Sequence, residues 1–329
     1  MTLGESITEG ILAFRNHKMK IVFCVFAFVF FIFVLFPYDD LSDLVTEKVA
    51  QATQNQVFLR FEHLGLAVFP PSLALDQVEV DTPFLPTLKA SSMTLAPSIA
   101  RFLAFSPGAS FSASDLFKGD LSGSVGAKKE KEVQKIDLSL DYDGFDLKTM
   151  GEFFDSSWPI QGQASVGVKG LVEMEFTEQP EGELEITIDK MVLPNTLPST
   201  IPFVGGTQIP QIAFGKVKLQ GRLTNREFII DSGTFGEEKD ALRGLMKGKL
   251  QITFVRMGQQ IVPQFGPYDL RVDLQMDRGF EADLQRRLTI VYDMIGRYKT
   301  ATGKGARYMM RVAGTNFYAP PNVTAISSL

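Results

Sequence analysis

The side chains that could do acid–base or metal chemistry in this chain are almost all carboxylates. The 329 residues include 38 Asp and Glu but only two His and one Cys. Asp141 and Asp143, followed by Gly144, have the spacing that begins a calcium loop, and they could also form a carboxylate pair for general acid–base work. The remaining ligand spacing of a calcium loop is missing, so a turn at the end of a strand is the simpler interpretation.

Nucleophilic catalysis finds no support in the sequence either. Because His17 precedes the apolar segment described next, a Ser–His–Asp arrangement would have to use His63, which stands beside Glu62 at the junction of two predicted strands. The sequence contains no GxSxG, P-loop, HExxH or paired-cysteine motif. We therefore predict that the protein is not an enzyme and has no cofactor or metal site.

One apolar segment decides where the protein would be located. Residues 21–36 read IVFCVFAFVFFIFVLF and carry no charge. As a helix, residues 19–37 would be about 28 Å long, close to the ~30 Å hydrocarbon core of a bilayer. Basic residues precede the segment and acidic residues follow it: Arg15, Lys18, Lys20, Asp39, Asp40 and Asp43.

This charge asymmetry predicts a single-pass signal anchor at 19–37, with residues 1–18 as a cytoplasmic tail and the remainder exported. The alternative is a cleaved signal peptide, but the segment is long and no small-x-small cleavage site follows it. The only cysteine, Cys24, lies inside this segment, so the exported part has no disulfide. The net charge of −5 argues against a nucleic-acid partner.

After the anchor the apolar period changes from helical to strand-like. Residues 38–56 predict an amphipathic linker helix, because Leu41, Leu44, Val45 and Val49 share one stripe. Residues 57–329 then predict one periplasmic β domain in which apolar and polar residues alternate along many segments, such as 136–142, 184–188 and 268–276. We expect a long antiparallel β-meander, and recurrent glycines within its strands favour a curled sheet.

A one-sided sheet must cover its apolar face. Two helices, predicted over 147–154 and 282–298, could supply that cover. If they cover only part of the face, the sheet must close on itself or hold something apolar. Bulky residues on the apolar side, among them Phe254, Tyr268, Met276 and Tyr308, favour a filled interior.

The segment 193–214 differs from the strands around it. It carries four prolines and a Gly-Gly pair but remains apolar. It could be a long loop packed on the sheet, or an exposed surface that contacts a partner. On the second interpretation the candidate contact residues are Ile201, Phe203, Val204 and Ile209.

Together these features resemble a known family. The anchor ends in Phe-Pro-Tyr-Asp-Asp-Leu at 36–41, and strand–glycine units such as LFKGDLSGSVG at 116–126 follow. The chain resembles a divergent form of the N component of bacterial type II secretion. Residues 57–80, VFLRFEHLGLAVFPPSLALDQVEV, are also similar to the start of AsmA-like proteins. The ending VAGTNFYAP at 312–320 is similar to the closing strand of both groups.

The resemblance implies a place and two possible functions. It implies a bacterial inner-membrane protein with a periplasmic β domain. Its anchor would contact the lipids of the inner membrane. The first function is a non-enzymatic accessory subunit of type II secretion whose β domain docks other components or the substrate. The alternative is a module that binds or transfers lipid by holding acyl chains in an apolar β trough.

Overall fold

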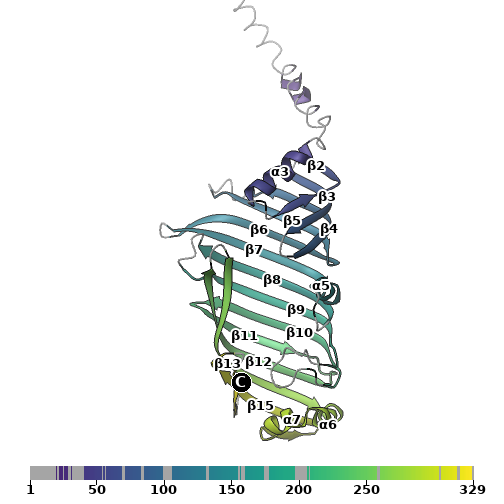
Figure 1. Cartoon of the computed structure of the whole chain (residues 1–329), viewed down its shortest axis with the longest axis vertical. Coiled ribbons are helices and arrows are strands. Elements are labelled where there is room, and N and C mark those ends of the chain that lie inside the picture. Colours follow the sequence, from purple (N-terminus) through teal and green to yellow (C-terminus); the bar gives the residue numbers. More distant parts are fainter. Residues whose placement is uncertain are drawn as a thin grey trace, which may run out of the picture.

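The computed structural model describes most of the chain after the predicted anchor. It covers residues 20, 22–24, 26–28, 31 and 41–327, except for 54, 56, 69–70, 83–84, 99–105, 131–132, 155, 157–159, 174–177, 197–205, 207, 258–259, 304 and 317–318. The described part is one antiparallel sheet of 16 strands with a few short helices (Figure 1). The predicted class, a long antiparallel β-meander, is therefore confirmed.

The strands follow one another along the chain and, with few exceptions, through the sheet. Their bounds are β1 Phe58–Arg60, β2 His63–Val68, β3 Pro71–Thr82, β4 Leu85–Pro97, β5 Gly108–Leu116, β6 Gly119–Glu130, β7 Val133–Asp146, β8 Gln161–Glu173, β9 Glu181–Leu193, β10 Ile212–Thr224, β11 Glu227–Phe235, β12 Leu242–Met257, β13 Gln260–Asp277, β14 Lys299–Thr302, β15 Gly305–Gly314 and β16 Asn322–Ala325.

Both ends of the sheet are built in the same way. At the N-terminal end the short strands β1 and β2 pair with successive parts of β3. At the C-terminal end the short strands β14 and β16 pair with successive parts of β15. Short edge strands limit pairing with further chains, so the meander is bounded at both ends.

Local irregularities bend the strands of the sheet. Neighbouring strands twist by roughly 20–25°, and β-bulges add to this where the register shifts, for example at Tyr142/Phe145 and Leu250/Ile252. Gly248 has φ +150° where a Cβ would meet the backbone of Asp269, so this bend requires glycine.

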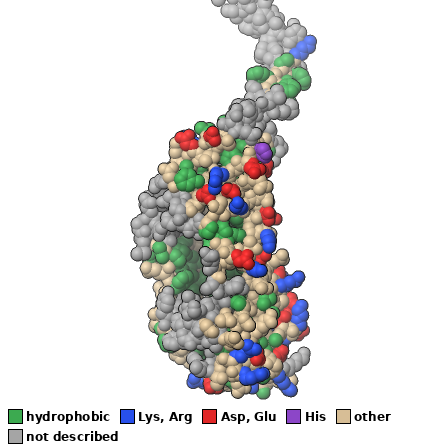
Figure 2. All heavy atoms as spheres, turned by 45° about the vertical axis from the view of Figure 1, so that its right-hand side comes forward, with side chains coloured by type: hydrophobic (Ala, Val, Ile, Leu, Met, Phe, Trp, Pro, Cys, Tyr) green, Lys and Arg blue, Asp and Glu red, His purple; other side chains and the backbone are tan. Residues whose placement is uncertain are grey.

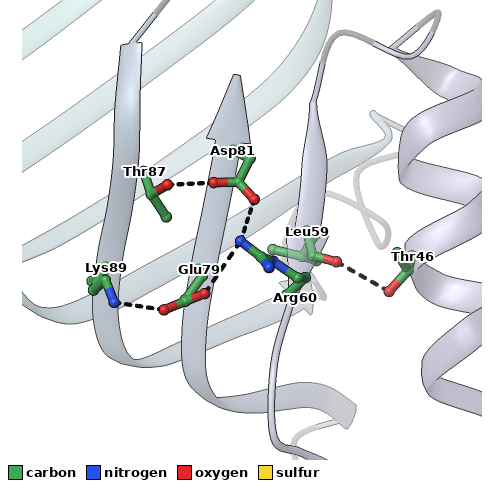
Figure 3. Close-up of polar contacts among 7 residues, drawn as sticks. All are labelled: Thr46, Leu59, Arg60, Glu79, Asp81, Thr87 and Lys89. Carbon is green, nitrogen blue, oxygen red and sulfur yellow. Dashed lines mark hydrogen bonds and ion pairs between the residues drawn. The ribbon is translucent and has the colours of Figure 1, made fainter. Parts of the chain in front are cut away.

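Helix α3 (Ser42–Ala52) covers the N-terminal end of the apolar face, and it lies within the predicted linker helix. The stripe formed by Leu41, Val45 and Val49 packs on the first strands. Leu75, fully buried, and Val78, 2% exposed, lie at the centre of this cluster. The helix also protects the edge strand, because Thr46 Oγ1 donates a 3.1 Å hydrogen bond to Leu59 O in β1 (Figure 3).

On the opposite, polar face of these strands, charged side chains form a cross-strand network (Figure 3). Arg60 lies 2.5 Å from Asp81 and 3.4 Å from Glu79, and Lys89 binds Glu79 at 2.7 Å. The pKa of Asp81 is lowered, mainly by the hydrogen bond from Thr87 and to a lesser degree by the charge of Arg60. The network is exposed and its charges balance, so we assign it to sheet pairing.

The C-terminal end is covered by two helices where the sequence predicted one. Helix α6 spans Arg278–Arg287 and α7 spans Thr289–Gly296. The chain leaves helical geometry at Leu288, with φ −125° and ψ 52°. Because Asp277 accepts a hydrogen bond from Phe280 N, the first helix begins four residues before the predicted start at 282. The apolar stripe of these helices, Leu284, Leu288, Tyr292 and Ile295, packs on the sheet.

Glu281 lies at the centre of this C-terminal core and is 8% exposed. One of its carboxylate oxygens accepts hydrogen bonds from Tyr308 (2.7 Å) and Tyr292 (2.9 Å) and lies 2.6 Å from Lys299 Nζ. Burial alone would raise the pKa of Glu281, but these three partners together hold it below the usual value. The pKa of Tyr308 is raised well above its usual range, mainly by burial and to a lesser degree by the hydrogen bond to Glu281.

A fourth helix, α5 (Leu147–Phe153), lies at the rim of the sheet between β7 and β8 and confirms the helix predicted at 147–154. Asp146 begins it by accepting hydrogen bonds from Lys148 N and Thr149 N. Phe153 meets Phe117 edge to face at 4.9 Å.

The predicted anchor at 19–37 is described only in part. Residues 20, 22–24, 26–28 and 31 are helical, and the side chains of Val22, Phe23, Phe26, Phe28 and Phe31 are 57–70% exposed. The rest of the segment and the predicted tail at 1–18 are not among the described residues. Within the described part of the chain, no helix is both long and apolar enough to span a membrane.

Candidate functional site: an apolar trough

The apolar face of the sheet is continuous along its whole length. Since strand register places cross-strand partners on one face, the side chains can be followed from strand to strand. One row runs through Leu75, Met93, Ala113, Leu121, Tyr142, Val166, Ile186, Leu219, Gly233, Met246, Val272 and Met310. A second row runs through Leu73, Leu95, Phe111, Gly123, Leu140, Val168, Leu184, Gly221, Ile230, Gly248, Leu270 and Val312.

The opposite face of the same strands is polar. A matching row there runs through Thr94, Ser112, Ser122, Asp141, Gly167, Glu185, Gln220 and Ser232. Ion pairs cross between strands on this face, such as Lys249 with Glu227 at 2.8 Å and Arg311 with Asp269 at 2.7 Å. The sheet therefore has one face suited to water and one that must be covered.

The cover differs between the ends and the middle. Clusters of buried apolar residues form under α3 and under α6 and α7. Between them, Val166, Leu184, Ile186 and Leu219 are only half-buried, and Val125 is 38% exposed. Figure 2 shows a hollow in this middle region with hydrophobic side chains inside it. We call the apolar face of β5–β11 the apolar trough.

Aromatic side chains lie next to glycines on the apolar face. A Cβ on Gly123 would come within 2.6 Å of the Phe111 ring, and one on Gly244 within 2.5 Å of the Phe235 ring. Phe228 covers Gly221 in the same way, and Tyr268 covers Gly314. Each ring lies in the space that a side chain at the glycine position would occupy. The rings therefore add apolar surface but do not fill the trough.

The bulky residues that favoured a filled interior lie elsewhere. Tyr308 and Met276 belong to the buried cluster under α6 and α7. Phe254 lies beyond the main sheet, in the distal part of the β12–β13 hairpin. Among the described residues, the apolar face is therefore covered by a buried cluster at the C-terminal end, whereas several of its side chains in the middle are only half-buried.

The tyrosine hydroxyls on this face are bound within the protein. Tyr142 donates to Leu116 O at 2.5 Å, and burial raises the pKa of Tyr142 to about 12. Tyr308 and Tyr292 donate to Glu281, and Tyr298 donates to Val323 O. With these groups satisfied, the trough offers a hydrocarbon surface to a ligand.

The trough is about as long as a bilayer's hydrocarbon core is thick. Adjacent strands lie about 4.8 Å apart, so β5 to β11 span about 29 Å. The hydrocarbon core of a bilayer is about 30 Å thick and contains two layers of acyl chains. The trough can therefore accommodate an extended acyl chain along its length.

The predicted partner-contact loop is described only at its base. Ile209 is 3% exposed, and its N–H donates to Asn195 O at 2.8 Å. At this position the structure agrees with the packed-loop interpretation. Ile201, Phe203 and Val204 are outside the described residues, so their proposed contact role stays a prediction.

The residues considered for chemistry do not form a site. Asp141 and Asp143 lie within β7, where the chain bulges at Gly144 (φ +68°), so the predicted strand-ending turn is wrong. His63 is exposed at the start of β2. Among the described residues, no three His, Cys, Asp or Glu side chains are grouped as a metal site would require.

Sequence reasoning identified the alternation along each strand but missed the trough as a site. The available signal for the trough was the pairing of glycines with aromatic residues on neighbouring strands. That pairing can be recognised only when the strand register is known. Comparisons with protein-family models, curated proteins and solved structures gave no match. The resemblance to type II secretion and AsmA-like proteins therefore stays a prediction.

Proposed function

We propose that the protein binds the hydrocarbon chains of lipids in the apolar trough and holds them away from water. One observation carries this proposal: the apolar rows continue through β5–β11, where no buried core cluster covers them within the described part of the sheet. This is the second of the two functions predicted from the sequence. The geometry of the described residues offers no comparable support for a docking role.

The energetics favour an acyl chain as the occupant. Burying one CH₂ group contributes about 0.8 kcal/mol, so a chain lying along the trough would gain several kcal/mol. A polar head group would find no such compensation on this face and would stay outside, towards a rim. The ligand class is therefore an amphiphile with a long hydrocarbon chain.

The covered ends constrain how such a ligand is held. Leu75 at one end and Tyr308 at the other are fully buried. A chain could not pass through either end without displacing a helix. We infer that the trough holds individual lipids that enter from the side, and that it is not one segment of an end-to-end conduit.

Attachment to a membrane belongs to the same proposal. The described part of 19–37 is a helix with exposed phenylalanines, which would be unfavourable in water. Insertion of this segment into a bilayer would cover them and would place the N-terminal end of the trough near the membrane. The basic residues before the segment favour a cytoplasmic N-terminus.

A charge placed in the trough tests the proposal. We expect Ile186→Lys to abolish co-purification of lipid with the full-length protein, measured by mass spectrometry of extracted lipids. Thr187→Lys is the matched control, because Thr187 is the next residue on the polar face. Equal lipid content in both variants, or none in the unmodified protein, would overturn the proposal.

A further inference from the structure

The distal part of the β12–β13 hairpin leaves the main sheet. β11 pairs with β12 only as far as Gln251, and β15 pairs with β13 only from Tyr268 onward. Beyond these points, Ile252–Met257 and Gln260–Phe265 pair with each other as a two-stranded ribbon. Figure 1 shows the ribbon standing upright in front of the left-hand ends of β8–β11.

The ribbon is fastened to distant parts of the chain by hydrogen bonds. At its base, Ile252 N donates to Arg226 O in the β10–β11 turn at 2.8 Å. Farther out, Gln179 in the β8–β9 connection binds both backbone groups of Phe254. Its Nε2 donates to Phe254 O at 3.0 Å, and Phe254 N donates to its Oε1 at 2.7 Å. One side chain thus acts as a latch between segments 75 residues apart.

We propose that this ribbon, residues 252–257 and 260–265, is a movable side wall of the apolar trough and that Gln179 holds it closed. The inference rests on the proposed function and specifies how a ligand would enter. With both ends of the trough covered, a lipid chain must enter across a rim. The ribbon passes the β8–β9 connection and the β10–β11 turn, which lie at one rim of the sheet.

The local structure suits such a movement. A two-stranded ribbon is only marginally stable without packing partners. At its base the register shifts between Leu250 and Ile252, leaving Gly266 and Pro267 outside the pairing. A bulge next to glycine allows the strands to bend there without breaking the main sheet. Two hydrogen bonds to one amide can break and re-form without disturbing a core.

Locking the ribbon tests the proposal. Gln179→Cys and Phe254→Cys, in a Cys24→Ala background, would be joined by a short bifunctional maleimide in the full-length protein held in nanodiscs. The probe is a 16-carbon fatty acid with a fluorophore at its chain end. We expect roughly tenfold slower uptake and release in the cross-linked protein than before cross-linking.

Opening the latch should have the opposite effect. Gln179→Ala removes both hydrogen bonds, and we expect roughly tenfold faster exchange of the probe. Gln220→Ala is the matched control, because Gln220 binds Glu185 and Ser232 on the polar face; its exchange rate should not change.

The two proposals fail in different ways. If probe exchange is unchanged in both the cross-linked and the Gln179→Ala proteins, the ribbon is not a movable side wall, but the proposed lipid binding still stands. If no variant binds the probe and the unmodified protein does not bind it either, both the proposed function and the movable side wall are overturned.

Discussion

The two ends of the sheet and its middle share one strand pattern but are covered differently. At each end an amphipathic helical segment packs on the apolar face, and buried side chains such as Leu75 and Tyr308 form a compact core. In the middle the same alternation leaves Val166 and Ile186 half-buried. Binary patterning thus produces the sheet, whereas the distribution of helices decides which part of it becomes a core.

Because the ends of the described sheet are covered and its middle is not, different residues should contribute to stability and to ligand binding. Residues at the ends should contribute strongly to the free energy of unfolding, because their neighbours cannot fill a cavity. Residues in the trough should contribute less to stability and more to ligand binding. The following substitutions test that division.

The largest expected effect is in the C-terminal core. Tyr308→Ala should reduce the free energy of unfolding by about 4 kcal/mol, since it removes a fully buried aromatic side chain. Ile186→Ala in the trough should cost about 1 kcal/mol, because that side chain is already partly exposed. Urea denaturation of both variants measures the difference, and equal losses would remove the distinction between end and middle.

Glu281→Ala should cost about 3 kcal/mol, because it leaves the buried Tyr308 hydroxyl and the Lys299 ammonium without their acceptor. Glu281→Gln retains an acceptor oxygen and should cost less. Thermal unfolding at neutral pH would rank the two variants. The reverse order would show that the carboxylate is not the centre of this core.

The charge of Glu281 also predicts a pH dependence. Its pKa is lower in the folded protein than in the unfolded chain, so its contribution to stability is present above the unfolded value and is lost as pH falls through the folded value. Between pH 6 and acidic pH, the unmodified protein should therefore lose more stability than Glu281→Gln. Parallel slopes for the two proteins would contradict this assignment.

A smaller effect is expected where the helices begin. Asp277→Ala removes the side-chain acceptor for Phe280 N and should cost about 1 kcal/mol. Asp277→Asn keeps an acceptor and should be nearly neutral. Circular dichroism during denaturation would report both changes. A loss as large as that of Tyr308→Ala would mean that the cap supports more than α6.

The smallest effect is expected at the N-terminal edge. Thr46→Val preserves the shape of the side chain but removes the hydrogen bond to Leu59 O, so it should cost about 1 kcal/mol or less. Amide hydrogen exchange in β1 should increase while exchange in β8 and β9 stays unchanged. Increased exchange in the middle strands would show that the two regions are not independent.

The sequence predicted most of the architecture. Strict alternation identified the strands. The turn between β10 and β11 has Asn225 and Arg226 both at positive φ, as a tight hairpin turn requires. The break at Leu288 was missed because a continuous apolar stripe hid the change of direction between α6 and α7. A capping Asp277 before the stripe was the available signal for the earlier start.

The trough was less predictable than the fold. Period-two alternation shows that a face is apolar, but it does not show whether a helix covers that face. The latch between Gln179 and Phe254 is equally invisible, because it joins segments 75 residues apart through a side chain that is ordinary in sequence. Both features depend on long-range register, which local patterns do not determine.

The most direct test of lipid binding in the apolar trough is photo-crosslinking inside cells. Benzoylphenylalanine would replace Ile186 on the trough face or Thr187 on the polar face of the same strand, and mass spectrometry would identify the adducts. We predict lipid adducts from position 186 and none from position 187. Protein adducts alone at position 186, or lipid adducts of equal yield at both positions, would contradict it.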